Sequence, residues 1–254
     1  MSTHIYTYSV SSEFEKMAVR VLRVAMYASF AVIMLICAAV HGVEGHTPMQ
    51  TDVSMRHDDG DARCAAVQAE NSSQLKVVIV YDSRSGRTLE MANALARGCE
   101  ASSAMASCGV VSVDVITWDG VRDAHALAVG SPTYYANPTA ATLRFIEDVL
   151  GNAWQTGGFN GVPAAVFATG GGVNQGTESA IAALARGLNA FGVSLVTPRV
   201  TTSGYAATIG AAAITDTAPW NGESVADEFL KTAYDLGTLL ADAAARAWTR
   251  RCSL

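Results

Sequence analysis

The sequence predicts an α/β protein with a doubly wound, five-stranded parallel sheet and helices on both of its faces. From Leu75 onward, short apolar runs alternate with segments of helical periodicity. Nearly continuous apolar runs are typical of strands that are buried on both faces of a sheet. Strands that alternate with helices over about 175 residues are typical of a parallel sheet whose strands are joined by helical crossovers.

Five apolar runs are the predicted strands. In chain order they are LKVVIVY (75–81), VVSVDVITW (110–118), ALAVGSP (126–132), VPAAVFATG (162–170) and VSLVTPRV (193–200). Apolar residues that recur with helical spacing predict amphipathic helices between and after these strands. The three helical sets are Leu89, Ala92, Ala96 and Cys99; Ile181, Leu184, Leu188 and Phe191; and Phe229, Leu236 and Leu240.

An N-terminal hydrophobic helix is predicted to precede this domain. Residues 24–40, VAMYASFAVIMLICAAV, carry no charge and follow Lys16, Arg20 and Arg23. A run of about 17 residues is near the lower limit for a spanning helix and just above the length of a signal-peptide core. Small residues at Cys37 and Ala39 fit a cleavable signal, whereas basic residues at a membrane edge fit an anchor. Residues 1–40 are therefore predicted to be a signal peptide or a membrane anchor, which implies a membrane-associated or secretory-pathway protein.

Residues 41–74 are predicted to be a flexible linker, because they are rich in small and polar types and show no sustained apolar period. Within them, Asn71-Ser72-Ser73 matches the N-glycosylation triplet, which matters only inside a secretory lumen. The folded domain is predicted to span residues 75–250.

Composition and cysteine usage exclude some partners. The chain has 17 basic and 23 acidic residues, a formal net charge of −6, so it offers no basic field for a nucleic-acid backbone. Its five cysteines are widely spaced and form no C-x-x-C pair, so they are predicted to be buried or incidental thiols and not a zinc site or a redox dithiol.

In a doubly wound sheet, ligands bind beyond the carboxyl ends of the strands, so the loops there are the candidate site. The first loop, SRSGRT (residues 83–88), lies between the first run and the following helix. Unpaired N–H groups and the dipole at a helix start favour an anion. Ser83, Ser85 and Thr88 can add hydroxyl donors, and Gly86 can adopt a left-handed conformation. These six residues alone fit a phosphate site and an ordinary serine-rich cap equally well.

Motifs that the chain lacks exclude several classes of phosphate-binding site. The first loop has no lysine and second glycine at the spacing of a nucleoside-triphosphate loop, and no two-glycine dinucleotide motif. The chain also has no C-x5-R run of a cysteine phosphatase. A phosphate held by hydroxyl and backbone groups suits a permanently bound monophosphate cofactor.

Two further loops can accommodate a planar group. In the second loop, GSPTYYANPTAATLRF (residues 130–145), two tyrosines offer an aromatic wall and Asn137 offers a donor and an acceptor. In the third loop, ATGGGVNQGTE (residues 168–178), three consecutive glycines let the backbone approach a ligand closely. Exposed turn tyrosines and a flexible glycine turn are the alternative interpretations of these two loops.

Taken in this order, the three loops resemble those of the flavodoxin-like family, and within it the WrbA-type NAD(P)H:quinone oxidoreductases. The resemblance covers roughly residues 75–247. The segments that carry it are KVVIVYDSRSGRTLEMANALARG, SPTYYANPTAATLRFIEDVLGNAW, GFNGVPAAVFATGGG and TSGYAATIGA.

The resemblance implies FMN as the cofactor, NAD(P)H as the electron donor, and a quinone or another small electron acceptor as the partner. It implies that the phosphate lies at Ser83, Arg84, Ser85, Gly86, Arg87 and Thr88. It further implies that the flavin ring lies against Pro132, Thr133, Tyr134, Tyr135, Ala136 and Asn137, with Thr169, Gly170, Gly171 and Gly172 on its other edge. Trp154 matches a family tryptophan that approaches the flavin of a neighbouring subunit, which implies a homo-oligomer, a dimer or a tetramer.

The chain also departs from the WrbA pattern. Those enzymes carry a histidine in the third loop, whereas this third loop has none and is about one residue longer. The missing histidine bears on catalysis and not on FMN binding. Two functions are therefore predicted: a two-electron quinone reductase whose flavin carries the chemistry, and alternatively a flavodoxin-type electron carrier or non-catalytic FMN-binding module.

Overall fold

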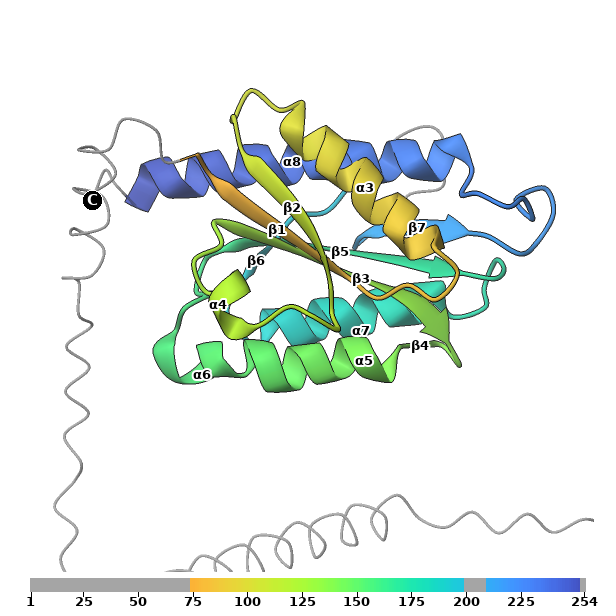
Figure 1. Cartoon of the computed structure of the whole chain (residues 1–254), viewed down its shortest axis with the longest axis horizontal. Coiled ribbons are helices and arrows are strands. Elements are labelled where there is room, and N and C mark those ends of the chain that lie inside the picture. The colour runs from red at the N-terminus through yellow and green to blue at the C-terminus, as the bar shows by residue number, and fades with distance from the viewer. Residues whose placement is uncertain (1–73, 199–208, 252–254) are drawn as a thin grey trace, which may run out of the picture. The chain divides into compact units, whose positions relative to one another are not determined.

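The computed structural model describes residues 74–198 and 209–251, which form an α/β unit (Figure 1). The main strands are β1 (Lys76–Tyr81), β2 (Ser107–Ser112), β3 (Ala126–Tyr134), β5 (Pro163–Gly170), β6 (Ser194–Leu195) and β7 (Ala211–Ile214), and β4 (Asn137–Pro138) is a short addition. The helices are α3 (Arg87–Glu100), α4 (Trp118–Val121), α5 (Ala140–Arg144), the π-helical segment η1 (Phe145–Leu150), α6 (Asn152–Thr156), α7 (Thr177–Asn189) and α8 (Asp227–Arg251).

The sheet has the strand order β2-β1-β3-β5-β6, with parallel pairing throughout this path. The chain adds β2 on one side of β1 and then returns to add β3 on the other side. This reversal between β1 and β3 is the point at which doubly wound sheets bind ligands. The predicted doubly wound parallel sheet is confirmed.

The fifth position of the sheet is divided between two short strands. β6 pairs with Pro163 and Ala164 at the start of β5, whereas β7 pairs with Phe167–Gly170 at its end. The prediction of one strand over residues 193–200 was therefore too long, and β7 was not predicted as a strand. Its apolar run AAAI is only four residues long, shorter than the five runs that were predicted as strands.

The predicted second strand was also displaced. It was placed at residues 110–118, but β2 ends at Ser112. The apolar residues Val113, Ile116 and Trp118 pack against the core from a turn and from α4 instead. Partly buried apolar residues therefore continue past the last residue of β2 that pairs in the sheet.

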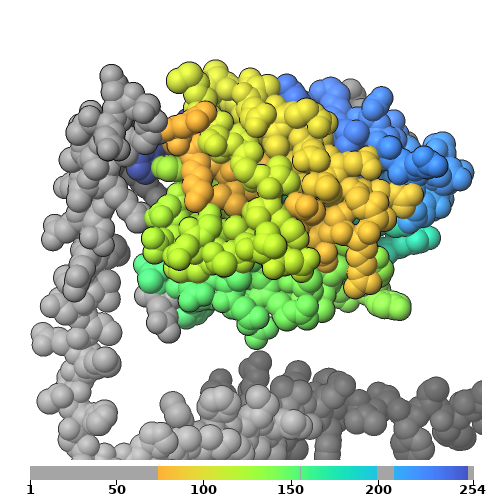
Figure 2. All heavy atoms as spheres, viewed as in Figure 1, coloured from red at the N-terminus to blue at the C-terminus, as the bar shows by residue number. Residues whose placement is uncertain are grey.

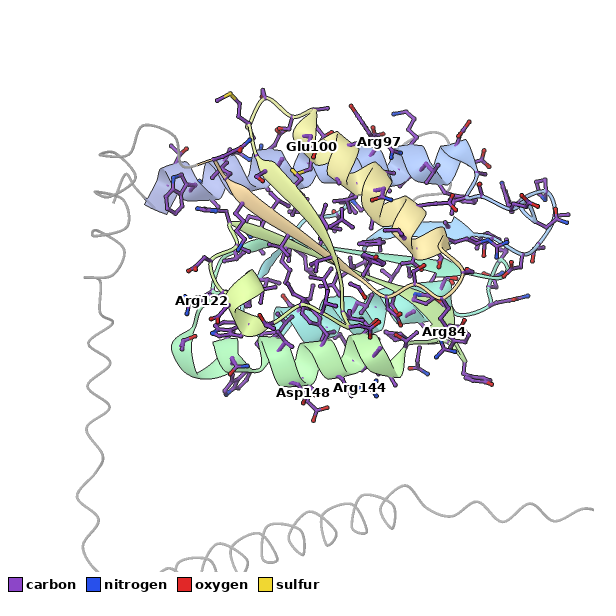
Figure 3. The ribbon with its side chains drawn as sticks, viewed as in Figure 1. Arg84, Arg97, Glu100, Arg122, Arg144 and Asp148 are labelled. Carbon is purple, nitrogen blue, oxygen red and sulfur yellow. A yellow bond between two sulfur atoms is a disulfide. The ribbon has the colours of Figure 1, made fainter. Side chains whose placement is uncertain are left out.

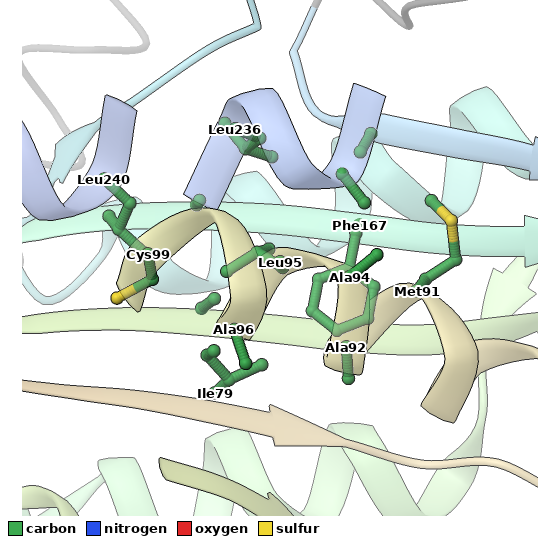
Figure 4. Close-up of a cluster of buried hydrophobic side chains, with 14 of the residues drawn as sticks. Ile79, Met91, Ala92, Ala94, Leu95, Ala96, Cys99, Phe167, Leu236 and Leu240 are labelled. Atoms are coloured by element: carbon green, nitrogen blue, oxygen red, sulfur yellow. The ribbon is translucent and has the colours of Figure 1, made fainter. Parts of the chain in front are cut away.

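Helices cover both faces of the sheet, and alternate residues of β1 point to opposite layers. Val77 and Ile79 pack in the cluster that contains α3 and α8, whereas Val78 and Val80 pack in the cluster that contains η1 and α7. Figure 4 shows the first cluster, in which Leu95 and Leu236 have no exposed surface. Full burial of each such side chain stabilises the fold by roughly 1.5–3 kcal/mol.

The helices α3 and α8 approach each other through glycines. A Cβ added at Gly98 would lie 1.8 Å from the Tyr234 carbonyl oxygen, and one added at Gly237 would lie 1.9 Å from that of Leu95. The Thr238 hydroxyl donates a hydrogen bond of 2.9 Å to the Gly98 carbonyl oxygen across this contact. These contacts with α8 fix the position of α3, whose first turn follows the first loop.

Two of the cysteines form a disulfide, so the prediction of thiols is wrong for this pair. Cys99, in the last turn of α3, is bonded to Cys108 of β2, with Cα atoms 6.2 Å apart and a sequence separation of 9. The bond depends on how a helix packs against a strand, which cysteine spacing alone does not encode.

Two predicted segments lie outside the described residues. They are the signal or anchor at residues 1–40, with its hydrophobic run 24–40, and the linker at residues 41–74, apart from Gln74. Among the helices of residues 74–198 and 209–251, none combines the length and the apolar character that crossing a membrane requires.

Candidate functional site

The three predicted loops meet at the carboxyl edge of the sheet, at the end where β4 lies (Figure 1). The Thr88 and Thr169 hydroxyls, from the first and third loops, are 2.9 Å apart and buried. The guanidinium carbon of Arg84 in the first loop lies 4.6 Å from the ring centroid of Tyr134 in the second. Figure 2 shows the orange atoms that follow β1 lying against the green atoms of the second loop. The structure thus brings together residues that are far apart in the sequence.

The first loop leaves several backbone donors free. Gly86 adopts a left-handed conformation with a φ of 89° at the start of α3, and no side chain caps the helix from that position. The Ser83 hydroxyl accepts a long hydrogen bond of 3.4 Å from the Leu89 N–H. Among the described residues, none accepts a hydrogen bond from the N–H groups of residues 85–88. These groups can therefore hold an anion, as a helix start does.

Arg87 is near this anion site, but its charge is engaged elsewhere. Its terminal nitrogens donate to Asp216 at 2.6 Å and to the Gly222 carbonyl oxygen at 3.0 Å. Because the Asp216 side chain is 58% exposed, this ion pair contributes about 1 kcal/mol or less. Arg87 therefore ties the first loop to the segment after β7.

That segment is a fourth loop (residues 215–222), which the sequence interpretation missed. The Thr215 and Thr217 hydroxyls donate to the carbonyl oxygens of Gly170 and Gly171, at 3.2 Å and 2.8 Å. The Asp216 N–H donates to the Gly171 carbonyl oxygen at 3.1 Å. The fourth loop thus fixes the third, and the signal that could have revealed it is the short apolar run AAAI at residues 211–214.

The second loop begins as a tight hairpin. Tyr134 and Asn137 pair across β3 and β4, and the turn residues Tyr135 and Ala136 have φ values of 52° and 61°. Two successive left-handed residues are usual in such a turn, but glycine or asparagine normally occupies them. Tyr135 is 97% exposed at the tip, so the turn displays an aromatic ring to solvent.

The hairpin rests on the start of α7. A Cβ added at Gly176 would lie 2.4 Å from the Ala136 Cβ, so only a glycine lets the two segments approach this closely. The glycine also has a φ of 94°, a conformation that residues with a side chain rarely adopt. The second and third loops are therefore held against each other by backbone contact.

Behind the loops lies a buried polar cluster, which consists of Asp82, Ser131, Thr139 and Thr142. The Thr139 hydroxyl donates to the Asp82 carboxylate and accepts from the Thr142 N–H at 3.2 Å. The Ser131 hydroxyl accepts from the Thr139 N–H at 3.0 Å. No sequence motif pointed to this cluster.

Three buried side-chain atoms lack a hydrogen-bond partner among the described residues, and they surround the same edge. They are Arg87 Nε, Thr133 Oγ1 and Thr177 Oγ1. Buried polar groups in folded proteins nearly always have a partner, so their clustering here indicates a ligand with polar groups. A compound with a phosphate at one end and a heterocycle with hydrogen-bonding edges at the other fits this arrangement.

Trp154 does not join these loops within one chain. It lies in α6, which precedes the start of β5 and so lies at the opposite edge of the sheet (Figure 1). Its side chain is 70% exposed and meets Phe191 edge-on, with ring centroids 6.5 Å apart. His125, directly before β3, is also at that opposite edge. Within the described ranges, no group of three or more metal-ligating side chains occurs.

The fold and the site define a doubly wound α/β protein whose loops at the carboxyl edge of the sheet can accommodate a phosphorylated planar cofactor. Comparison with known families identifies the family to which this protein belongs. A family model described as flavodoxin matches residues 79–228, more than half of the chain. The chain belongs to the flavodoxin family, and this membership supports FMN as the cofactor.

Individual relatives agree with this assignment. A flavodoxin of Aquifex aeolicus (strain VF5) is 36% identical over 117 residues, which are 46% of this chain and 62% of that protein. The crystal structure of a flavodoxin, WrbA-like protein from Agrobacterium tumefaciens has a TM-score of 0.54 at 21% identity, covering 68% of this chain and 99% of that one. A flavodoxin from the domain Archaea has a TM-score of 0.51 at 23% identity, covering 67% and 99%. At these identities the two structures show a shared fold.

Proposed function

We propose that this protein is a flavodoxin-type electron carrier that binds FMN and passes electrons between protein partners. The observation that carries the proposal is the first loop, whose N–H groups at residues 85–88 have no acceptor among the described residues. Family membership and the identity to a flavodoxin add support.

Different residues bind the two ends of FMN, the phosphate and the ring. Residues 83–88 bind the phosphate through backbone N–H groups and the Ser83, Ser85 and Thr88 hydroxyls. Residues 132–137 and 169–172 bind the ring, and the Thr133 and Thr177 hydroxyls provide buried donors there. When bound, FMN supplies the redox chemistry. The protein residues orient it and limit its contact with water.

A second candidate function is the WrbA-type reaction, in which NAD(P)H reduces FMN and a quinone takes two electrons. The small residues of the second and third loops favour it, since they leave room for a second flat molecule over the ring. The exposed Trp154 favours it too, because a neighbouring subunit in a dimer or tetramer can receive such a side chain. This candidate requires a homo-oligomer, which light scattering tests directly.

One set of experiments tests both candidates on the purified full chain. Titration of the apoprotein into FMN should quench the flavin fluorescence at one site per chain. Absence of quenching contradicts both candidates. For the carrier, we expect NADH and NADPH to leave the bound flavin oxidised and electrochemical reduction to occur in two separate one-electron steps. Rapid bleaching by either nucleotide, followed by reoxidation with benzoquinone, favours the reductase.

We also propose that residues 24–40 direct the chain to a membrane or into the secretory pathway. The Cys99–Cys108 disulfide supports this, because disulfides persist in oxidising compartments and are rare in reducing ones. Sequencing of the mature N-terminus distinguishes a cleaved signal from a retained anchor. Alkylation of the denatured protein in whole-cell extract, without a reductant, tests the disulfide, and labelling of Cys99 and Cys108 contradicts an oxidising compartment.

A further inference from the structure

We propose that Asp82 is a positioning residue for the cofactor: it locks the second loop to the first and places a negative charge behind the flavin site. The effect of Asp82 on the reduction potential of the flavin rests on the proposed function. Its effect on the position of the second loop concerns the protein alone. Asp82 is the residue between β1 and the first loop, and neither sequence motifs nor family resemblance assigned it a role.

Asp82 joins two segments that are 57 residues apart. Its backbone N–H donates to the Gly130 carbonyl oxygen at 3.1 Å, and its carboxylate accepts from the Thr139 hydroxyl. Thr139 follows β4 directly and caps α5 by accepting from the Thr142 N–H. One side-chain contact thus connects the phosphate-binding first loop to the end of the ring-binding hairpin.

The contact is reinforced by a closed set of hydroxyl groups. The Thr142 hydroxyl lies 2.9 Å from that of Thr139 and donates to the Ser131 hydroxyl at 3.2 Å. The Ser131 hydroxyl donates to the Pro132 carbonyl oxygen at 2.9 Å, at the first ring-binding residue. The position of residues 132–137 is therefore set from both ends of the hairpin by a hydroxyl network that Thr139 connects to Asp82.

A carboxylate is unusual at a position as buried as that of Asp82. Asp82 is 9% exposed, and the structure pairs it with no lysine, arginine or histidine of the described residues. Charge in a poorly solvated position acts over longer distances than charge in water. A negative charge next to both cofactor-binding loops disfavours the more negative, reduced state of a bound flavin. Asp82 should therefore hold the reduction potential of the flavin down.

Two substitutions separate the two roles. Asp82→Asn keeps an oxygen that accepts from Thr139 and removes the charge, whereas Thr139→Val removes the hydroxyl and keeps the shape. Thr139→Ser restores the hydroxyl and serves as the rescue variant. Asp148→Asn is the matched charge control, because Asp148 is exposed on η1 and lies on the outer side of its layer (Figure 3).

In the full-length protein loaded with FMN, Asp82→Asn should raise the midpoint potential of the flavin, because the buried negative charge is removed. Asp148→Asn should leave the midpoint potential unchanged. An unchanged potential in Asp82→Asn, or an equal rise in Asp148→Asn, overturns the electrostatic role.

The positioning role is measured without any cofactor. In the apoprotein, Thr139→Val should speed amide hydrogen exchange at residues 131–138 and leave exchange in α8 unchanged, and Thr139→Ser should restore protection. In the loaded protein, the same valine variant should weaken FMN binding about tenfold. Unchanged exchange at residues 131–138 overturns this role. Failure of the original protein to bind FMN contradicts the proposed function and leaves the exchange result as a valid test.

Discussion

The α3–α8 interface and the loops at the carboxyl edge share α3, which runs from one to the other. At the interface, backbones meet through Gly98 and Gly237, and the polar side chains there have partners, such as Ser102 with Asp242 at 2.6 Å. At the loops, Tyr135, Ala136 and Asn174 adopt left-handed conformations, and the buried side-chain atoms without partners in the described residues gather there.

This difference shows how one helix serves two purposes. Its distant end is fixed by packing that tolerates no added atom, so its position is fully determined by the protein. Its first turn retains unused donors and lies beside strained turns, which stay in place because the surrounding structure holds them. The interface should therefore determine stability, and the loops should determine ligand binding.

The largest expected effect is on stability, at the interface. Gly237→Ala would place a Cβ 1.9 Å from the Leu95 carbonyl oxygen, and the backbone there has no room to move. We expect a loss of about 3 kcal/mol in the free energy of unfolding of the apoprotein. Urea denaturation followed by circular dichroism measures it. Gly109→Ala is the control, because a Cβ there meets no atom within 4 Å. Equal stability of the two variants contradicts the close contact.

The next effect is on binding, in the first loop. Ser85→Asp places a carboxylate where the phosphate is proposed to lie, and like charges repel. We expect FMN affinity to fall about a hundredfold, while stability changes by less than about 0.5 kcal/mol because Ser85 is exposed. Fluorescence titration measures the affinity, and Ser103→Asp, on an exposed turn beyond the far end of α3, is the control. A Ser85→Asp protein that retains FMN disproves the phosphate assignment.

A smaller effect is expected where the second and third loops touch. Gly176→Ala would push against Ala136, whereas Gly157→Ala has a similar positive φ and no neighbour within 4 Å. Both variants should lose about 1 kcal/mol to backbone strain. Gly176→Ala should in addition weaken FMN binding about tenfold, because it shifts the hairpin. Identical affinities in the two variants would show that the hairpin contact does not support the site.

The smallest expected effect is a gain in stability. Replacing Tyr135 and Ala136 with Asn and Gly gives the turn residues that its backbone favours. We expect the apoprotein to gain about 1 kcal/mol, as when local strain is relieved elsewhere. FMN affinity should fall slightly because the exposed aromatic ring is lost. A stability loss on thermal denaturation would show that Tyr135 makes a contact that outweighs the strain.

The sequence predicted those parts of the protein that depend on local pattern. The run before Ser83 and the hydroxyl-rich residues up to Thr88 lie in one continuous stretch, so the strand, the loop and the helix start were all evident. The fourth loop was missed because β7 is short and its role depends on pairing with β5. Asp82 was missed because its partner Thr139 is 57 residues away. The disulfide likewise needed the packing of α3 against β2.

The divided fifth strand has a consequence for how the protein can change. β6 pairs with the first two residues of β5 and β7 with the last four, so each short strand is held by its own part of β5. A substitution that weakens the two-residue pairing of β6 therefore leaves the pairing of β7 intact, and β7 still delivers the fourth loop to the same position.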